Sequence, residues 1–415
     1  MCYNPGPADG YWGAKTNRAV KKLYETQNKS FDGTLDPDDI SLIEEIFSNK
    51  SDNQNCKTTT SPSPVIAKKL AQRRTINVFN AWNKKYGLSD VGLFWTALAR
   101  GPNNNTILLR SLGWNYHYAG QNWEWSHPRK NQFTIDKNYH GDWTQAKFGT
   151  ALALDFTNPE FQDIFTDVAA KQIKASQTDG VMLDWWHPNH KKTGLSKSAV
   201  NKARLQLAKK LRKALGEGAI ILGNVNYYIE KATVSEINGV YLELNKQKNK
   251  SDTKRTYNRN EFKKIENSLK YYNQNLRAPK LIAVEARRKT LSVSNSDRNS
   301  QENRKMAKLL TAMTTVIADN GYINYVDNDL DDLKSPVRDF MLYDFYSFDI
   351  GKPTSPMTEI KKGVGYKIFE NGIIAYNITS RDVKFNIFGS PLTIEASSGL
   401  FCSSNDGSVK CLSSS

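Results

Sequence analysis

Between residue 75 and residue 349, short apolar runs alternate with longer amphipathic stretches. Residues 161–175 and 199–215 carry apolar side chains at helical spacing, whereas the short runs have the length of buried strands. This alternation predicts a parallel sheet, and seven or eight such strands predict a closed (β/α)₈ TIM barrel. An open doubly wound sheet is the alternative, although no glycine-rich nucleotide loop follows a strand. The predicted strands are residues 76–79, 91–95, 180–184, 219–224, 239–243, 281–285 and 321–325.

The ends of the chain have different patterns. Residues 1–48 predict a small helical domain, in which Ala19, Val20, Leu23 and Tyr24 recur at helical spacing. Residues 49–74 are rich in Asn, Ser, Thr and Pro and predict a linker. Residues 350–415 predict a β-sandwich-like module, because short strands separated by turns replace the alternation; these strands are 366–369, 372–376, 383–387 and 392–394.

Charge and hydropathy limit the partners of the chain. The 415 residues carry a formal net charge of +16, with the cations scattered over helical stretches. Solvated helix faces and attraction to an anionic glycan both explain this charge, and no nucleic-acid motif accompanies it. No apolar run approaches the ~20 residues that span a bilayer. The first five residues do not resemble a signal peptide, so the start is expected to be truncated or misassigned in a secreted or cell-envelope protein.

Four cysteines are present, and none belongs to a CxxC motif. Cys402 and Cys411 flank a polar turn, which predicts a local disulfide in an oxidising compartment; two free thiols are the alternative. We expect no metal and no other cofactor. His187 and His190 are three residues apart, but Pro188 between them disfavours a shared helical face, and no third ligand has a convincing spacing.

Several predicted strands end in polar side chains, which a barrel gathers around one mouth: Asp184, Asn224, Glu243, Glu285 and Asn324. Glycoside hydrolysis needs two carboxyl groups, one protonated and one ionised. Asp184 and Glu243 lie at tips four and six and are the predicted catalytic pair. An N-cap for Asp184 and a structural hydrogen bond for Glu243 are the alternatives. Glu285 is the competing acid, unless Arg287 or Arg288 holds it in a salt bridge.

Aromatic residues cluster around the predicted site. Seven of the nine tryptophans lie between residues 95 and 186, and residues 113–143 predict a long decorated loop over the barrel mouth. Flat apolar rings and polar donors suit a sugar pocket, although core packing also explains a tryptophan cluster. The expected substrate-binding residues are Trp185, Trp186, Trp95, Trp114, His117, Asn224, Glu285 and Asn324.

The first 48 residues resemble the peptidoglycan-binding-like domain. The resemblance lies in residues 6–16, Ala19-Val20 and Asp32-Gly33. The helix that precedes this turn in the family is absent from the chain. The resemblance implies binding of peptidoglycan through residues 1–48, and a helical spacer is the alternative.

Residues 75–380 resemble the hypothetical glycosyl hydrolase families with a TIM barrel. The motifs are residues 154–160, 179–184 and 239–243, followed by 351–353 and 369–377 at the start of the C-terminal module. The resemblance implies acids at the ends of strands four and six, here Asp184 and Glu243. We expect Asp184 to be the nucleophile or base and Glu243 the general acid, which requires Glu243 to occupy the drier environment.

The sequence therefore predicts a glycoside hydrolase that acts on a cell-envelope or extracellular polysaccharide. Two alternatives remain open at this point. One is a carbohydrate-binding or scaffold protein without catalysis on the same barrel, and the other is a metal-dependent polysaccharide deacetylase with a clustered His/Asp site.

Deletion of residues 1–48 tests the wall-binding interpretation. We expect the shortened protein to be retained less by insoluble peptidoglycan, because the resembling segment is gone, and to hydrolyse soluble substrate at the same rate. A sedimentation assay measures retention. Equal retention of the two proteins would leave only the spacer interpretation.

Overall fold

The computed structural model divides the chain into two units, Met1–Thr60 and Ser61–Ser415. It describes scattered positions between residues 17 and 42, including the run 29–34, and then residues 63–72, 75–81, 91–118, 133–136, 151–190, 193–226, 229–244, 257–289, 298–330, 337–405 and 408–412. In the first unit, described positions from 17 to 25 and from 39 to 42 are helical, as predicted. Val20 and Tyr24 are buried, and the Tyr24 hydroxyl donates a hydrogen bond to Asp39. This bond ties the two helical stretches together.

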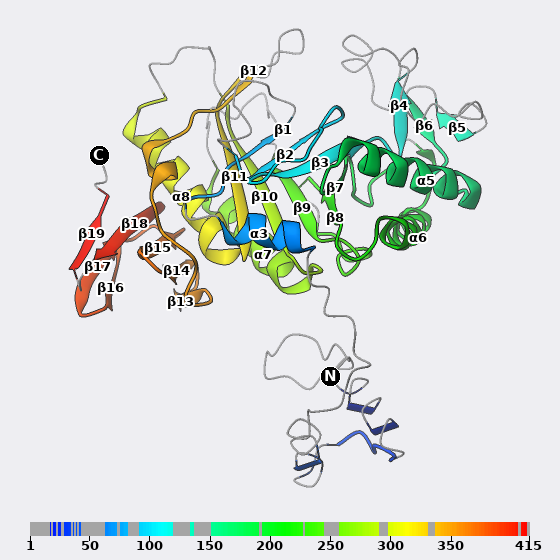
Figure 1. The fold of residues 1–415 in the computed structure, drawn as a ribbon. Coiled ribbons are helices and arrows are strands. Elements are labelled where there is room, and N and C mark those ends of the chain that lie inside the picture. Colours follow the sequence, from blue (N-terminus) through cyan, green and yellow to red (C-terminus); the bar gives the residue numbers. More distant parts are fainter. Residues whose placement is uncertain are drawn as a thin grey trace. The chain divides into compact units, whose positions relative to one another are not determined.

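Eight parallel strands form the barrel of the second unit (Figure 1). A bridge between Val78 and Ile323 brings the eighth strand beside the first, which confirms the predicted barrel. A short antiparallel strand, β12 (Val337–Asp339), extends the sheet beyond β11. The barrel strands are, in order, β1 (Phe79–Ala81), β2 (Leu93–Thr96), β3 (Ile107–Leu112), β7 (Gly180–Leu183), β8 (Ile220–Asn224), β9 (Gly239–Leu244), β10 (Leu281–Lys289) and β11 (Asn320–Leu330). The third of these, β3, was not among the predicted strands.

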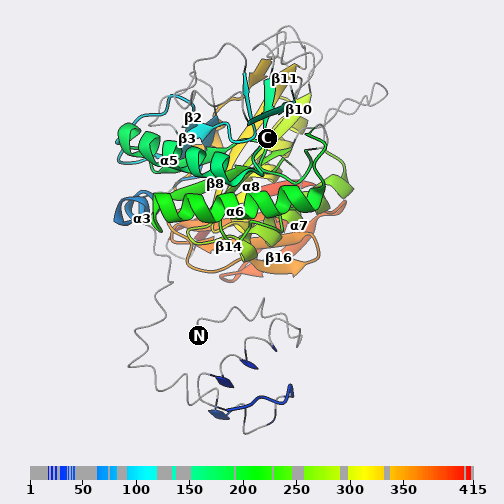
Figure 2. The ribbon, with the colours of Figure 1, turned by 90° about the vertical axis from the view of Figure 1, so that its right-hand side faces the viewer.

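Four long helices cover the outside of the barrel: α5 (Pro159–Ser176), α6 (Lys197–Leu215), α7 (Arg259–Asn275) and α8 (Gln301–Ile317). Each begins at a polar side chain that accepts hydrogen bonds from the first turn, at Asn158, Ser196, Asn258 and Ser300 respectively. Figure 2 shows α5 and α6 side by side on one flank. Residues 97–106, between β2 and β3, form turns instead of a helix, so the (β/α) repeat is incomplete at that point.

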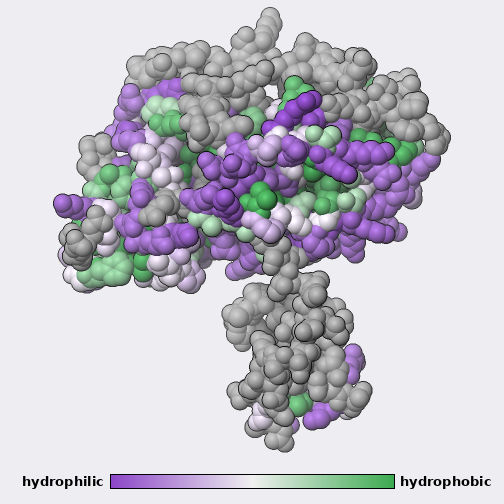
Figure 3. All heavy atoms as spheres, in the orientation of Figure 1, coloured by the Kyte–Doolittle hydropathy of each residue, from purple (hydrophilic) through white to green (hydrophobic). Residues whose placement is uncertain are grey.

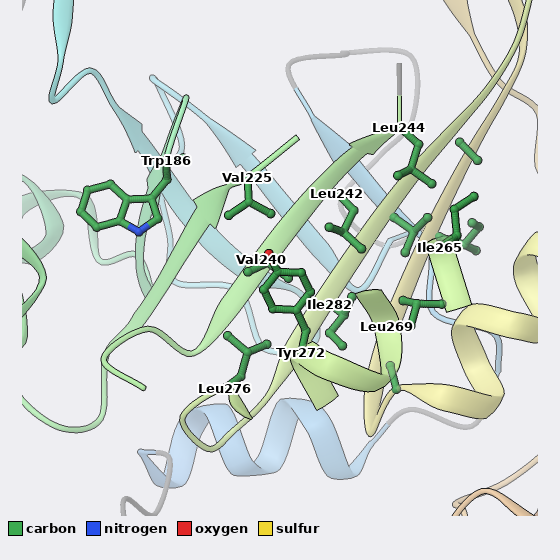
Figure 4. Packing of buried hydrophobic residues seen from close by; sticks show 14 of the residues in the cluster. Trp186, Val225, Val240, Leu242, Leu244, Ile265, Leu269, Tyr272, Leu276 and Ile282 are labelled. Carbon is green, nitrogen blue, oxygen red and sulfur yellow. The ribbon is translucent and has the colours of Figure 1, made fainter. Parts of the chain in front are cut away.

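Strand side chains alternate between the barrel interior and the surrounding helices. Figure 4 shows the outer side: Val240, Leu242 and Ile282 pack toward Ile265, Leu269 and Tyr272 of α7. The inner side forms a separate cluster, in which residues of several strands meet at the barrel axis. Its strand members are Phe79, Leu93, Trp95, Ile107, Leu109, Met182, Ile220, Leu222, Tyr241, Leu281, Ala283 and Tyr322.

Helix α3 (Pro64–Ala71) closes the bottom of this inner cluster. Ile66 is buried among residues that begin the strands, such as Ile107 and Leu281. Lys69 binds Asp179, the residue before β7, with 2.5 Å between Nζ and Oδ2. The predicted linker of residues 49–74 is therefore too long at its C-terminal end. Its Ser-Pro pair starts a helix, because Ser63 accepts a hydrogen bond from the Ile66 N–H and Pro64 needs no donor at the first helical position.

Three further strands lie between β3 and α5. They are β4 (Tyr116–Tyr118), β5 (Thr134–Asp136) and β6 (Ala151–Leu154), and they form a small antiparallel sheet in the order β4-β6-β5. The long loop predicted for residues 113–143 thus contains strands at its described positions. Trp123, Trp125, His127, His140 and Trp143 lie outside the described residues.

The C-terminal module is built on a five-stranded antiparallel sheet, in the order β13 (Thr358–Lys361), β14 (Val364–Phe369), β15 (Gly372–Asn377), β18 (Ser398–Asn405) and β19 (Ser408–Cys411). It follows the short 3₁₀ helix η5 (Asp344–Ser347). Every residue of β15 is buried because both faces are covered. Ile374 and Tyr376 belong to the cluster that includes α8, whereas Ile373 and Ala375 contact the hairpin of β16 (Val383–Ile387) and β17 (Ser390–Ile394). This layering agrees with the predicted sandwich-like module.

A buried lysine joins the C-terminal module to α8, and a disulfide links two strands within the module. The Lys367 ammonium donates to the Thr315 and Ala318 carbonyls at 3.3 and 2.9 Å, and so satisfies the C-terminal end of α8. Cys402 and Cys411 face each other on β18 and β19 and form a disulfide, as the sequence predicted.

Hydrophilic residues predominate among the described residues on the face shown in Figure 3, where hydrophobic residues occur only in small groups. None of the described helices is long and apolar enough to cross a bilayer.

Two truncated chains test the role of α3. A chain that begins at residue 75 loses Ile66 and Lys69, and uncovers the bottom of the barrel. We expect it to lose at least about 3 kcal/mol of unfolding free energy, from the exposed apolar surface and the unpaired Asp179. A chain that begins at residue 61 keeps α3 and is the control. Thermal unfolding measures both, and equal melting temperatures would show that α3 does not support the barrel.

Candidate functional site

Inward-facing positions change from apolar to polar at the C-terminal ends of the strands. Two residues after an apolar member of the inner cluster, the chain places a polar side chain on the same face. The pairs are Met182 and Asp184, Leu222 and Asn224, Tyr241 and Glu243, Ala283 and Glu285, and Tyr322 and Asn324. The strand register sets Glu243, Glu285 and Asn324 side by side on β9, β10 and β11. At the C-terminal ends of its strands, the barrel therefore has a layer of polar side chains next to the apolar inner cluster.

Asp184 follows directly after β7 and is surrounded by donors. Its Oδ1 accepts hydrogen bonds from the Asn224 amide at 2.8 Å and from the Trp185 backbone at 3.0 Å, and its Oδ2 accepts one from the Tyr116 hydroxyl at 3.3 Å. Burial and the nearby charge of Glu243 nevertheless raise the pKa of Asp184 to about 6. Asp184 does not cap a helix, because the next helix, α6, is capped by Ser196.

Asn224 connects Asp184 to Glu243. Its Nδ2 also donates to Glu243 Oε2, at 3.0 Å. Because both accepting carboxylate oxygens lie within 3.0 Å of the same nitrogen, they cannot be more than about 6 Å apart. Two acids from strands four and six therefore face each other across one amide group.

Arg287 holds the other oxygen of Glu243. Its guanidinium donates to Glu243 Oε1 and, through Nε, to Glu285 Oε1 at 2.5 Å. Glu285 Oε2 accepts a further hydrogen bond from the Tyr241 hydroxyl at 2.7 Å. Glu285 therefore forms the salt bridge with Arg287 that the sequence offered as the alternative to a catalytic role. Glu285 lies buried beside the pair, bonded to Arg287 and Tyr241.

The structure does not set Glu243 in the drier environment expected from the sequence, because Asp184 and Glu243 are both partly exposed. The Glu243 side chain is 17% exposed and is paired with Arg287, which favours the carboxylate. Asp184 is the acid whose pKa burial raises. The difference arises because Arg287 comes from β10, and its position could not be read from the residues around Glu243.

Trp95, Trp114 and Trp186 are completely buried and present no ring face to a substrate. Trp95 stacks on Phe79 inside the barrel, with 4.9 Å between ring centroids. Trp114 donates from Nε1 to the Asp184 carbonyl at 2.6 Å. These residues pack and hold the site, so we do not assign sugar contacts to them.

The buried side chain of Trp186 stabilises the turn that follows Asp184. Its Nε1 donates to Thr233 at 2.8 Å, and the Arg204 guanidinium lies 4.9 Å from its ring centroid. The ring covers Gly223, where a Cβ would lie 2.5 Å from it, so only glycine fits at this point of β8.

Trp185 is the partly exposed indole next to Asp184. Its backbone has φ of 54°, a left-handed conformation that is unfavourable for a bulky side chain. This conformation directs the Trp185 N–H to Asp184 while the ring rests against Tyr116 and Ala153. Backbone strain of this kind is frequent at binding and catalytic sites.

Two predicted substrate-binding residues remain, Asn324 and His117. Asn324 is buried, and its amide donates to the Phe79 carbonyl at 3.3 Å, between the eighth strand and the first. His117 lies in β4, where its backbone pairs with Leu152, and its side chain is outside the described part of the structure.

His187 and His190 stack on each other in the loop after Asp184, with 5.1 Å between ring centroids. Burial lowers the pKa of His187 to about 4 and that of His190 to about 3, with nearby cationic groups adding to the effect. Both rings are therefore neutral near pH 7. Within the described residues, no group of three or more His, Cys, Asp or Glu side chains is arranged to hold a metal ion.

Sequence reasoning missed the contacts of Tyr116 and Arg287 with the two acids. For Arg287 a signal was available, because it follows Glu285 by two residues and must share its face of the strand. Tyr116 gave no such signal, because it comes from the inserted sheet and not from a barrel strand.

The raised pKa of Asp184 predicts a stability effect. Between about pH 4 and pH 6 the folded state keeps a proton that the unfolded chain releases, so the contribution of Asp184 to stability falls as pH rises through this window. Asp184→Asn should thus stabilise the fold at pH 7 by up to about 3 kcal/mol, and less at pH 4. Chemical unfolding at the two pH values measures this. Asp163→Asn, on the exposed side of α5, is the control, and a variant equally stable or less stable at pH 7 would contradict the raised pKa.

Three solved structures match this chain at low similarity. The glycoside hydrolase domain of PelA from Pseudomonas aeruginosa is 10% identical, with 64% of this chain and 99% of that chain covered and a TM-score of 0.42. An α-amylase from Geobacillus thermoleovorans complexed with acarbose is 13% identical, with 78% and 95% covered and a TM-score of 0.41. A maltogenic α-amylase, AmyB, from Thermotoga neapolitana is 10% identical, with 82% and 97% covered and a TM-score of 0.41.

A search of curated proteins found no match. A family model matches residues 109–373, more than half of the chain, from the third barrel strand into the C-terminal sheet. The chain therefore belongs to Hypothetical glycosyl hydrolase family 15.

Proposed function

We propose that this glycoside hydrolase retains anomeric configuration, with Asp184 as general acid and base and Glu243 as nucleophile. The observation that carries the proposal is the Asn224 amide, which holds one oxygen of each acid at 2.8 and 3.0 Å. Two oxygens bound by one nitrogen at these distances are less than about 6 Å apart, which accommodates the ~5–5.5 Å of retaining enzymes and falls short of the ~6.5–9.5 Å that leaves room for the attacking water in inversion.

The distribution of one proton between the two acids supports these roles. Two carboxylates at this separation repel each other, so one of them keeps a proton. Arg287 stabilises the charged form of Glu243, while burial favours the neutral form of Asp184. An acid with a pKa near 6 is suited to protonate a leaving group close to neutral pH.

The reaction then has two steps. In the first, Glu243 attacks the anomeric carbon as the glycosidic C–O bond breaks, and Asp184 gives its proton to the departing oxygen. In the second, the Asp184 carboxylate takes a proton from water, which attacks the anomeric carbon and releases Glu243. Asn224 and Tyr116 keep both carboxyls in place, and the partly exposed ring of Trp185 offers an apolar face for the sugar.

We further propose a polysaccharide of the cell envelope or the extracellular space as the substrate. The net charge of +16 favours a glycan with acidic groups. The resemblance of residues 1–48 to a peptidoglycan-binding-like domain supports attachment to the wall, and the disulfide of Cys402 and Cys411 fits an oxidising compartment.

Two substitutions separate the roles. Asp184→Asn should lower hydrolysis of polysaccharides about 10²–10⁴-fold, because their leaving groups need a proton, and should affect the first step on dinitrophenyl glycosides far less. Glu243→Gln should abolish turnover of both classes, because no glycosyl ester forms. Reducing-sugar release and a panel of aryl glycosides measure the rates, with Asp163→Asn as the control.

Azide rescue reports the stereochemistry. With Asp184→Ala, azide should give a glycosyl azide of the same anomeric configuration as the substrate, because it attacks the ester of Glu243. With Glu243→Ala, azide enters directly and inverts the centre. Exchange of these two outcomes would make Asp184 the nucleophile, and full activity in both variants would end the assignment of this pair. A wild-type protein that hydrolyses none of the substrates would favour a binding protein.

A further inference from the structure

Arg287 lies between two carboxylates at the end of the barrel. It follows Glu285 by two residues on β10, and its side chain is 1% exposed. The guanidinium contacts Glu243 on one side and Glu285 on the other. One buried cation is therefore shared by an acid of the proposed catalytic pair and an acid outside that pair.

The position of Arg287 is fixed from several directions. Glu285, which receives its Nε–H, is itself bound by the Tyr241 hydroxyl. Tyr241 is packed in the inner cluster against Trp95, with 5.0 Å between ring centroids. The Arg287 backbone N–H donates to the Tyr257 hydroxyl at 2.8 Å, and this hydroxyl donates to the Leu244 carbonyl at 2.8 Å, which ties the tip of β10 to that of β9. The guanidinium fork thus has little freedom to turn away from Glu243.

Several ionisable groups act on Glu243 in this layer. Asp184 adds a like charge when it ionises, and Glu285 adds a second negative charge that Arg287 offsets. His187 is neutral near pH 7 because burial lowers its pKa to about 4. Burial also raises the pKa of Tyr257 and Tyr241 above the ordinary value, so both remain neutral. Arg287 and Glu285 are consequently the neighbours whose formal charges act on Glu243 with opposite sign.

We propose that Arg287 is a positioning residue that, itself held by Glu285 and Tyr241, keeps the Glu243 carboxylate ionised and aimed across the site, so that the proton shared with Asp184 rests on Asp184. This inference deepens the proposed glycosidase function and rests on it. Glu285 acts through Arg287, because its negative charge moderates the field that the guanidinium exerts on Glu243.

The two buried charges predict opposite shifts in the pH profile. In Arg287→Met, Glu243 loses its cation, so the acidic limb of kcat/KM should move up by about one pH unit or more. The variant should lower kcat more than it changes KM, since the loss falls on the reacting group. In Glu285→Gln, the positive charge of Arg287 is no longer partly offset by Glu285, so the acidic limb of kcat/KM should move to lower pH. A purely structural role for the two residues predicts no such pair of opposite shifts.

Further variants distinguish a shifted pH profile from misfolding of the Arg287→Met protein. Arg287→Met leaves Glu285 buried without its cation, which is costly. The double variant Arg287→Met with Glu285→Gln removes both charges and should fold. The acidic limb of its kcat/KM profile should lie between the acidic limbs of the two single variants. Arg287→Lys keeps the charge and should restore most of the wild-type profile. Lys270→Met, which breaks the ion pairs of Lys270 with Glu266 in α7 and with Glu359 in β13, is the control and should leave the profile unchanged.

A measurement without substrate separates this inference from the proposed function. The difference in unfolding free energy between each protein and its Glu243→Gln derivative, followed from pH 3 to pH 8, reports the pKa of Glu243. An unchanged pKa in Arg287→Met and in the double variant would overturn the role of Arg287, whatever the activity. A raised pKa in a protein whose wild type hydrolyses none of the aryl glycosides or polysaccharides would overturn the reaction, and leave the hold of Arg287 on Glu243 standing.

Discussion

The side-chain amide of Asn224 donates its two hydrogens to carboxyl groups that come from different strands. Asp184 and Glu243 would repel each other as a pair of anions, and burial makes the repulsion stronger. The amide offers each of them a donor and fixes their separation. The polar layer at the barrel mouth depends on this contact, because without it the two acids would have no common partner on the strand between them.

Two buried tryptophans, Trp114 and Trp186, stabilise the backbone next to Asp184. Trp114 bonds the backbone carbonyl of Asp184, and Trp186 packs on Gly223 of the neighbouring strand while Thr233 holds its indole nitrogen. Both rings are fully buried, so they fix the Asp184 turn instead of facing a sugar. The left-handed backbone of Trp185 is tolerated in this setting, since the contacts of Trp114 and Trp186 hold the backbone next to it.

Much of the site followed from local sequence patterns, because parallel strands end at one edge and an apolar run shows where each ends. Asp184, Asn224 and Glu243 could be placed together in this way. Strand β3 was missed because Arg110 interrupts its apolar run; the structure buries this arginine on the outer side, where its Nε donates to Gln172 of α5 at 3.0 Å. The burial of the tryptophans and the pairing of Arg287 with Glu243 were not predicted, since both depend on contacts between segments distant in the sequence, although the face that Arg287 shares with Glu285 could be read from their spacing.

A site that gathers three carboxyl groups and one arginine in a partly buried layer opposes folding, and the rest of the barrel must offset that cost. The inner cluster below the layer is aromatic and aliphatic from Tyr241 down to the first residues of the strands, and Ile66 of α3 seals its lower end. Because strand side chains alternate, the same period that places Tyr241 in this core places Glu243 above it. The Tyr241 hydroxyl links the two levels, as its ring packs on Trp95 while its oxygen bonds Glu285. Stability and chemistry are therefore coupled through single strands, and a change deep in the core at Tyr241 would reach Glu243 through Glu285 and Arg287.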